Sequence, residues 1–324
     1  MDVAVFVVDG VADFGFAALL ETFGMANALS AQLTAGPQPW EVTTVSLGKS
    51  VQSSYGHTIP TTALAELSVL PGTMIVPAVN VLGAEALIDL VSAPASREVL
   101  ERIRQVRDAG AHLAAACTGT FYLAEAGVLD GSSATTSWWL GPSFRRRYPR
   151  VALDEGQTLC RGDHITTAGA SLSHMDLALS LVHGASPALA ELVVRYLAAG
   201  NRMVQSAFII PEVVAKGNSV TAAFERWVRA HLAEQFTIAQ AAPELGVTER
   251  SLQRTTQAEL GMSPRDFVND IRLEHAAHLL RSTSLTVEAV ASKVGYLNAS
   301  TLRNLVRRRR GMSISELRAS RVVW

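Results

Sequence analysis

The sequence predicts two domains of different fold class, an α/β domain at residues 1–200 and an all-helical domain with two helix-turn-helix units at residues 221–324. Short apolar runs alternate with helical stretches in the first part. In the second part, a segment repeats itself about 50 residues further along. Charge also divides the chain, because the first 218 residues hold 13 basic and 19 acidic side chains, whereas residues 219–324 hold 15 and 10. Residues 201–220 are predicted to be the linker between these domains.

The composition is that of a globular protein of 324 residues, 48% hydrophobic and 18% charged. A chain of this length and composition can bury a sizeable core, which excludes disorder as its main state. Pro71 and Pro77 interrupt its longest uncharged stretch, residues 67–84, so we predict no membrane span. The start of the chain lacks a basic leader, and Cys117 and Cys160 form no disulfide framework. We therefore expect a reducing, cytoplasmic setting.

The first domain is expected to contain a parallel sheet of the flavodoxin-like kind with helices on both faces. Strands are predicted at 3–8, 41–47, 74–78, 112–116 and 164–169, and helices from Phe16, over 96–109, up to 126 and over 171–183. Sheets of this kind bind ligands beyond the carboxyl ends of their strands. The sequence contains no GxGxxG or Walker A pattern and no clustered metal-ligand spacing, so it predicts neither a nucleotide cofactor nor a metal.

Cys117 lies where a predicted strand turns sharply into a helix, in the segment AAACTGTFYLAEAG. A thiol at this position points into the cleft, and the N–H groups of the following helix favour a thiolate or another anion. Three interpretations stay open. The thiol lines a small-molecule pocket, it is a redox-sensitive group, or it is a buried residue without a current role.

An internal repeat dominates the second domain. Four residues of the first copy recur in the second copy 49 positions later: Ile238, Ala242, Leu245 and Gly246 correspond to Val287, Ala291, Val294 and Gly295. Beyond the turn the offset becomes 50, so that Leu252 matches Leu302 and the motif GMS at 261–263 matches GMS at 311–313. Chance rarely produces two copies with matched trailing motifs.

The spacing of the repeat indicates a helix, a tight turn and a second helix in each copy. The glycine ends the first helix, and we expect Thr248 and Ser300 to cap the second helices. Residues 264–282 have helical apolar periodicity and connect the copies. Upstream, we expect Thr221 to cap a helix that leads into the first copy.

The outer faces of the two second helices are candidates for reading double-stranded DNA in the major groove. Arginine can pair with guanine, and glutamine or asparagine can pair with adenine. Because Leu252 and Leu302 face inward, the predicted readers are Arg250, Gln253, Arg254 and Gln257, and in the second copy Ser300, Arg303, Asn304 and Arg307. The adjoining Arg308, Arg309 and Arg310 are expected to meet phosphates or solvent.

Residues 221–324 resemble the DNA-binding domain of the AraC/XylS family. The motif residues that carry the resemblance include Ser263–Pro264, Arg272–Leu273, Ala276, Val294–Gly295–Tyr296, Gly311 and Arg318. Thr256 and Val306 stand where the family usually has Phe, Asn304 where it has Arg, and Ile314 where it has Pro. The resemblance implies base contacts on the predicted outer faces, with the contact at Asn304 the least typical.

Residues 1–200 resemble the DJ-1/PfpI family, and the segment CTGTFYLAEAGVLDG followed by ATTSWW resembles the sensor half of GlxA-type regulators. The resemblance implies dimerisation and a ligand site, for which we select Cys117, Thr118, Asp13 and Ser137. Enzymes of the superfamily pair the cysteine with a histidine and an acid, but Thr118, Ser137 and Gly15 stand near those positions. We therefore expect no enzyme activity.

The sequence thus predicts a cytoplasmic, homodimeric, sequence-specific DNA-binding regulator that is gated by a small molecule or a protein partner and needs no cofactor. Two alternatives stay open. One is a cysteine-dependent enzyme, a hydrolase or lyase of the DJ-1/PfpI type. The other is a constitutive DNA-binding protein whose first domain only dimerises.

Overall fold

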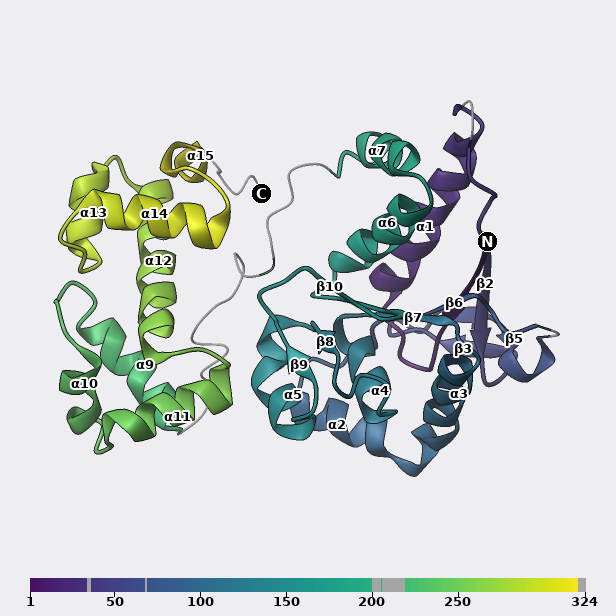
Figure 1. Cartoon of the computed structure of the whole chain (residues 1–324), viewed down its shortest axis with the longest axis horizontal. Helices are drawn as coiled ribbons and strands as arrows, with labels where there is room; N and C mark the ends of the chain where they lie inside the picture. Colours follow the sequence, from purple (N-terminus) through teal and green to yellow (C-terminus); the bar gives the residue numbers. More distant parts are fainter. Residues whose placement is uncertain (34–35, 68, 200–204, 206–218, 320–324) are drawn as a thin grey trace. The chain divides into compact units, whose positions relative to one another are not determined.

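The computed structural model describes the chain except for residues 34–35, 68, 200–204, 206–218 and 320–324. The chain divides into two compact units, Met1–Gln205 and Ser206–Trp324 (Figure 1). Gln205, which the sequence analysis places in the linker, is thus part of the first unit. Within the described ranges, no helix combines the length and the apolar character that crossing a bilayer requires.

The first unit is built on a seven-stranded sheet in the order β10-β11-β7-β6-β1-β2-β5. The strands are β1 (Asp2–Phe6), β2 (Glu41–Ser46), β5 (Thr62–Ala63), β6 (Thr73–Val76), β7 (His112–Ala116), β10 (Leu159–Gly162) and β11 (Ile165–Ala168). All neighbours pair in parallel except β10 and β11. The sheet is thus parallel, as predicted, apart from the antiparallel edge strand β10. Short pairs β3 (Ser50–Gln52) with β4 (Thr58–Pro60), and β8 (Ser133–Ala134) with β9 (Ala152–Leu153), lie outside it.

Helices cover both faces of the sheet, as predicted. Figure 1 shows α1 (Asp13–Ser30), α6 (Ser173–Ala185) and α7 (Pro187–Tyr196) on one face. The other face carries α2 (Ala84–Ser92), α3 (Arg97–Asp108), α4 (Thr120–Glu125) and α5 (Gly141–Arg147). Successive strand residues alternate between the two layers, so that Val5 packs with α1 and α6 whereas Phe6 packs with α2 to α4.

The strand order reverses between β1 and β6, which places the loops after both strands at a topological switch point. Residues 10–13 lie there between two neighbours, since Val11 bridges Ser53 on one side and Val79 on the other. Helix α1 begins at Asp13, earlier than the predicted Phe16. Asp13 consequently belongs to the first turn of α1, at the carboxyl edge of the sheet.

The second unit consists of helices arranged around one long connecting helix. They are α9 (Val220–Ala230), α10 (Ile238–Glu244), α11 (Glu249–Leu260), α12 (Pro264–Ser282), α13 (Val287–Lys293), α14 (Ala299–Arg310) and α15 (Ile314–Ala319). The bounds of α12 are those predicted from the sequence. Its first half, with Phe267 and Ile271, completes the apolar core of α9 to α11. Its second half, with Ala276 and Leu280, completes the core of α13 to α15.

The helix ends confirm one predicted cap and correct two. Thr248 caps α11 by accepting a bond from the Ser251 N–H at 3.1 Å. The cap of α14 is Asn298, which accepts from the Thr301 N–H at 3.0 Å, so the prediction of Ser300 was wrong. The turn of the second copy is one residue longer, which brings Asn298 to the place of Thr248. Ser219, not Thr221, caps α9, because that helix begins at Val220.

Candidate functional site

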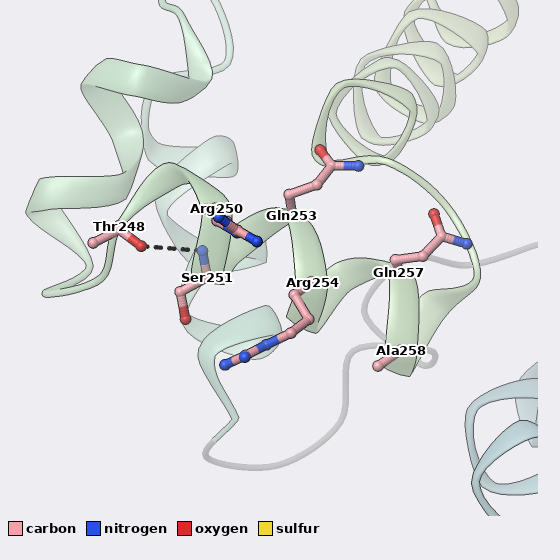
Figure 2. A pocket seen from close by; sticks show the side chains of 7 residues that line it. All are labelled: Thr248, Arg250, Ser251, Gln253, Arg254, Gln257 and Ala258. Atoms are coloured by element: carbon pink, nitrogen blue, oxygen red, sulfur yellow. Dashed lines mark hydrogen bonds between the residues drawn. The ribbon is translucent and has the colours of Figure 1, made fainter.

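The predicted reading face of α11 is exposed and continuous. Leu252, Thr256 and Leu260 are buried against the unit. The opposite face presents the predicted readers Arg250, Gln253, Arg254 and Gln257, all exposed. Figure 2 shows these side chains along the helix, with the hydrogen bond from the Ser251 N–H to the Thr248 hydroxyl at its start. The arrangement offers two guanidinium and two carboxamide groups to a base edge.

The predicted face of α14 is exposed in the same way. Ser300, Arg303, Asn304 and Arg307 are exposed, whereas Leu302, Leu305 and Val306 are buried. Arg303 is not free of other contacts, because its guanidinium lies 3.0 Å from the Glu288 carboxylate of α13. Position 239, which corresponds to Glu288 in the first copy, is an alanine. This ion pair is therefore specific to the second copy, and a DNA base would have to compete with Glu288 for Arg303.

The three arginines at the end of α14 differ in environment. Arg309 forms ion pairs with Asp266 at 2.7 Å and with Asp270 at 3.5 Å, both on α12. Burial lowers the pKa of Arg310, which is only partly accessible. Arg308 is exposed. The expectation that all three meet phosphate or solvent is thus wrong for Arg309, which ties α14 to α12.

Arg272 joins the two helix-turn-helix units through its guanidinium. It is buried on α12 and donates a hydrogen bond to the Glu234 carbonyl at 2.6 Å, in the loop before α10. The same group lies 5.0 Å from the Phe236 ring centre, and 5.5 Å from the ring centre of Tyr296 in the turn of the second helix-turn-helix. The guanidinium therefore contacts both the loop that enters the first helix-turn-helix and the turn of the second.

A groove of about 1000 Å³ lies along the first half of α12, beside these contacts. Its walls come from the loop before α10, from α12, and from the turn and first half of α14. Arg265 and Arg308 bring two exposed positive charges to it, together with Asn304 and Thr301. Such a groove suits an anionic backbone better than an apolar ligand.

Cys117 of the first unit occupies a strained turn at the end of β7. Its φ of 57° lies in the left-handed region, which is uncommon for a residue with a side chain. The sulfur is buried and lies 2.8 Å from the Ser137 hydroxyl. Burial raises the pKa of the thiol, and this effect outweighs the hydrogen bonds. Burial therefore opposes the thiolate that the sharp turn into a helix favours.

Thr118 and Ser137 lie against Cys117, as the sequence analysis placed them, but both are already engaged. The Thr118 hydroxyl donates to the Val79 carbonyl at 2.6 Å and accepts from the Val79 N–H at 2.9 Å. Ser137 is fully buried beside the thiol. A hydroxyl is too weak a base to activate a thiol.

Asp13 is held by a different loop. Its carboxylate accepts bonds from the hydroxyls of Ser53 at 2.6 Å and Ser54 at 3.0 Å, and lies 2.7 Å from Nδ1 of His57. The Ser53 bond, followed by that of His57, holds the pKa of Asp13 well below its usual range. The carboxylate is therefore charged and occupied, and the structure brings it to Ser53 and His57 rather than to the thiol.

His174 is a residue of this region that the sequence analysis did not select, because no spacing links it to Cys117. Nε2 accepts the Ala78 N–H at 3.1 Å, so Nδ1 carries the proton and donates to the Ser171 carbonyl at 2.7 Å. Burial lowers the pKa of His174 to about 4. The ring lies against Gly15, where a Cβ atom would come within 2.6 Å of Nε2. Gly15 and His174 follow strands β1 and β11, so both lie at the carboxyl edge of the sheet. This position is the feature of the sequence that could have indicated their proximity.

Comparisons with known proteins agree with this architecture. The sequence model of the DJ-1/PfpI family matches residues 1–184, and that of a helix-turn-helix domain matches residues 241–320. A solved protein from Vibrio parahaemolyticus, described as a candidate transcriptional regulator, is 17% identical and has a TM-score of 0.52. The alignment covers 61% of this chain and 98% of that protein, and it shows similarity of fold.

Two relatives from Pseudomonas aeruginosa match along most of their length. The HTH-type transcriptional regulator CdhR is 29% identical over 320 residues, which cover 96% of this chain and 89% of that protein. The HTH-type transcriptional regulator GbdR is 27% identical over 298 residues, covering 90% and 77%. With more than half of its residues matched by the family, the chain belongs to the DJ-1/PfpI family and joins that domain to a helix-turn-helix domain.

Proposed function

We infer that the chain is a DNA-binding transcription regulator that reads a specific sequence with α11 and α14. The observation that carries this inference is the pair of exposed polar faces on two helix-turn-helix units that share α12. CdhR and GbdR, whose alignments cover 96% and 90% of this chain, are named as HTH-type transcriptional regulators. Since the side chains on each face can donate to and accept from base edges, each helix would enter a major groove.

The side chains of the second unit divide into two roles in this proposal. The readers on α11 and α14 contact bases, and Arg265 and Arg308 contact the phosphate backbone along the groove beside α12. Phosphate contacts fix the register of the protein without choosing a sequence. Arg309 does not contribute to either role, because it is bound to Asp266 and Asp270.

The first unit would gate this activity without catalysing a reaction. A neutral thiol beside a serine hydroxyl lacks a base, and both ring nitrogens of His174 are engaged. A small molecule or partner at the carboxyl edge would act by binding one state of the unit more tightly than another. Dimerisation through this unit would bring two DNA-binding units to paired half-sites in the cytoplasm, where the DNA lies.

Genome-wide binding tests this proposal. The native chain is compared with an Arg250/Gln253/Arg254 triple-alanine variant and with an Arg226/Arg281 double-alanine control. The control removes an equal number of positive charges, two, from exposed positions on α9 and α12, outside the two reading helices. Sharp peaks that share a motif in the native chain and the control, but vanish in the triple variant, support sequence-specific reading. Equal loss in the control and the triple variant would reduce the interaction to charge alone.

A further inference from the structure

Gln205 is a polar side chain that the first unit encloses almost completely. It is 4% exposed, although its neighbours in the sequence belong to the predicted linker. Its nitrogen Nε2 donates to the carbonyls of Thr136 at 2.8 Å and Glu155 at 2.7 Å. Its oxygen Oε1 accepts the Ala170 N–H, and its own backbone N–H donates to the Thr158 hydroxyl at 3.1 Å.

The cradle around Gln205 matches a primary carboxamide and no charged group. The NH₂ group donates one hydrogen to each of two carbonyl oxygens, and the side-chain oxygen accepts a hydrogen bond from one backbone N–H. The site also needs a glycine beside it, because a Cβ at Gly169 would collide with Oε1 and the amide carbon of Gln205. A carboxylate in the same place would face the carbonyls of Thr136 and Glu155 without a proton to share.

One wall of this cradle, residues 136–137, also borders Cys117. Thr136 receives the Gln205 amide on its carbonyl, and its hydroxyl donates to the Cys117 carbonyl at 2.7 Å. The next residue, Ser137, bonds the sulfur. On the other side of the cradle, the Ala170 N–H donates to Gln205. The consecutive residues Thr136 and Ser137 therefore connect Gln205 with Cys117 through hydrogen bonds.

We propose that the Gln205 carboxamide is an internal ligand of this cradle and acts as a latch between the Cys117 site and the segment that leads to the DNA-binding unit. Atoms added at the thiol require Ser137 to move, which displaces the carbonyl of the preceding Thr136 from Gln205. The latched and released states thus differ in their affinity for a ligand at Cys117, and by linkage the ligand changes the occupancy of the latch. A molecule with a primary carboxamide or urea group would compete for the cradle itself.

Only the last step, from the latch to DNA, rests on the proposed function. The latch itself is tested within the first unit of the full-length chain. Cys160 is replaced by serine, and alkylation of Cys117 by iodoacetate, which has no carboxamide group, is followed by mass spectrometry; the thiolate displaces iodide and its proton goes to the buffer. The variants are Gln205→Leu, which keeps the approximate volume, and Gln32→Leu, a control at an exposed glutamine of the same unit.

We expect Gln205→Leu to accelerate alkylation of Cys117 about tenfold, the equivalent of ~1.4 kcal/mol, and the control to leave the rate unchanged. A second measurement covers a Gln205→Leu variant that fails to fold. In the otherwise native sequence, alkylation of Cys117 should speed amide hydrogen exchange at Ala170, whose N–H is bound to Gln205. Unchanged alkylation in a folded Gln205→Leu variant overturns the latch, and so does unchanged exchange at Ala170 after alkylation.

Binding to DNA is then measured separately for the same proteins. Coupling between Cys117 and Gln205 without specific DNA binding would overturn the proposed function and leave the latch intact. Specific DNA binding without that coupling would overturn the latch alone. Where both hold, alkylation of Cys117 should change the affinity for DNA in the parent chain, and this change should disappear in Gln205→Leu.

Discussion

Replacing Arg272 by methionine should weaken the second unit and loosen the spacing of its two readers. Methionine keeps most of the apolar stem but removes the guanidinium. The lost bond to the Glu234 carbonyl has a charged donor and is worth ~1.5–3 kcal/mol. The two ring contacts, at 5.0 and 5.5 Å, add ~0.5–1 kcal/mol each. Relief of the desolvation of a buried cation offsets part of this sum, which leaves a net loss of ~2 kcal/mol.

Two assays separate the stability effect from the spacing effect. Denaturant unfolding of the full chain measures the free energy of unfolding of the second unit in Arg272→Met and in Arg281→Met, an exposed control on the same helix. Gel-shift titrations then compare a two-part DNA site, which holds the sequences recognised by both α11 and α14, with a one-part site that holds only one of them. Because Arg272 contacts the entry to one helix-turn-helix and the turn of the other, the variant should lose more affinity for the two-part site.

The reasoning about Arg272 has two clear points of failure. If Arg272→Met unfolds at the same denaturant concentration as the native chain, its buried contacts contribute no net stability. If the variant loses affinity equally for the one-part and the two-part site, Arg272 supports each fold but does not set the distance between the readers.

Four further expectations follow from single contacts. Burial holds the pKa of His174 near 4, against 6.5 for an unfolded chain, so the stability of the first unit should be full above about pH 6.5 and fall by up to ~3 kcal/mol as the pH drops toward 4; His174→Leu should flatten this dependence in urea unfolding. Gly15→Ala should cost ~1–3 kcal/mol in the same assay, because the new methyl meets the His174 ring, and unaltered stability would disprove that packing. Glu288→Gln should leave stability almost unchanged, since the pair with Arg303 is exposed and screened by solvent, yet tighten DNA binding in gel shifts; weaker binding would contradict the idea that this ion pair restrains Arg303. Arg254→Ala should cost ~1–3 kcal/mol at one base position of the preferred site, whereas a uniform loss on unrelated sequences would assign Arg254 to phosphate.

The sequence by itself determined the features that depend on local spacing. The repeat at 49 to 50 residues, the bounds of α12 and the strand at 112–116 follow from apolar periodicity and turn residues within short windows. The exposure of Arg254 and Asn304 follows in the same way, since the buried Leu252 and Leu302 define which face of each helix remains outside.

Only the tertiary structure decided the chemical state of the side chains, because that state depends on partners far away in the chain. Helix periodicity cannot show that Arg309 pairs with Asp266, or that His174 accepts a bond from Ala78, 96 residues earlier. The sharp turn at Cys117 suggested a thiolate, but the degree of burial reversed the direction of its pKa shift. The sequence analysis placed Gln205 in the linker, because a single glutamine carries no local sequence pattern that would indicate burial. Three separate segments of the first unit supply its hydrogen bonds. Desolvation and long-range hydrogen bonding are properties of the folded environment, and they decided which of these groups are available for function.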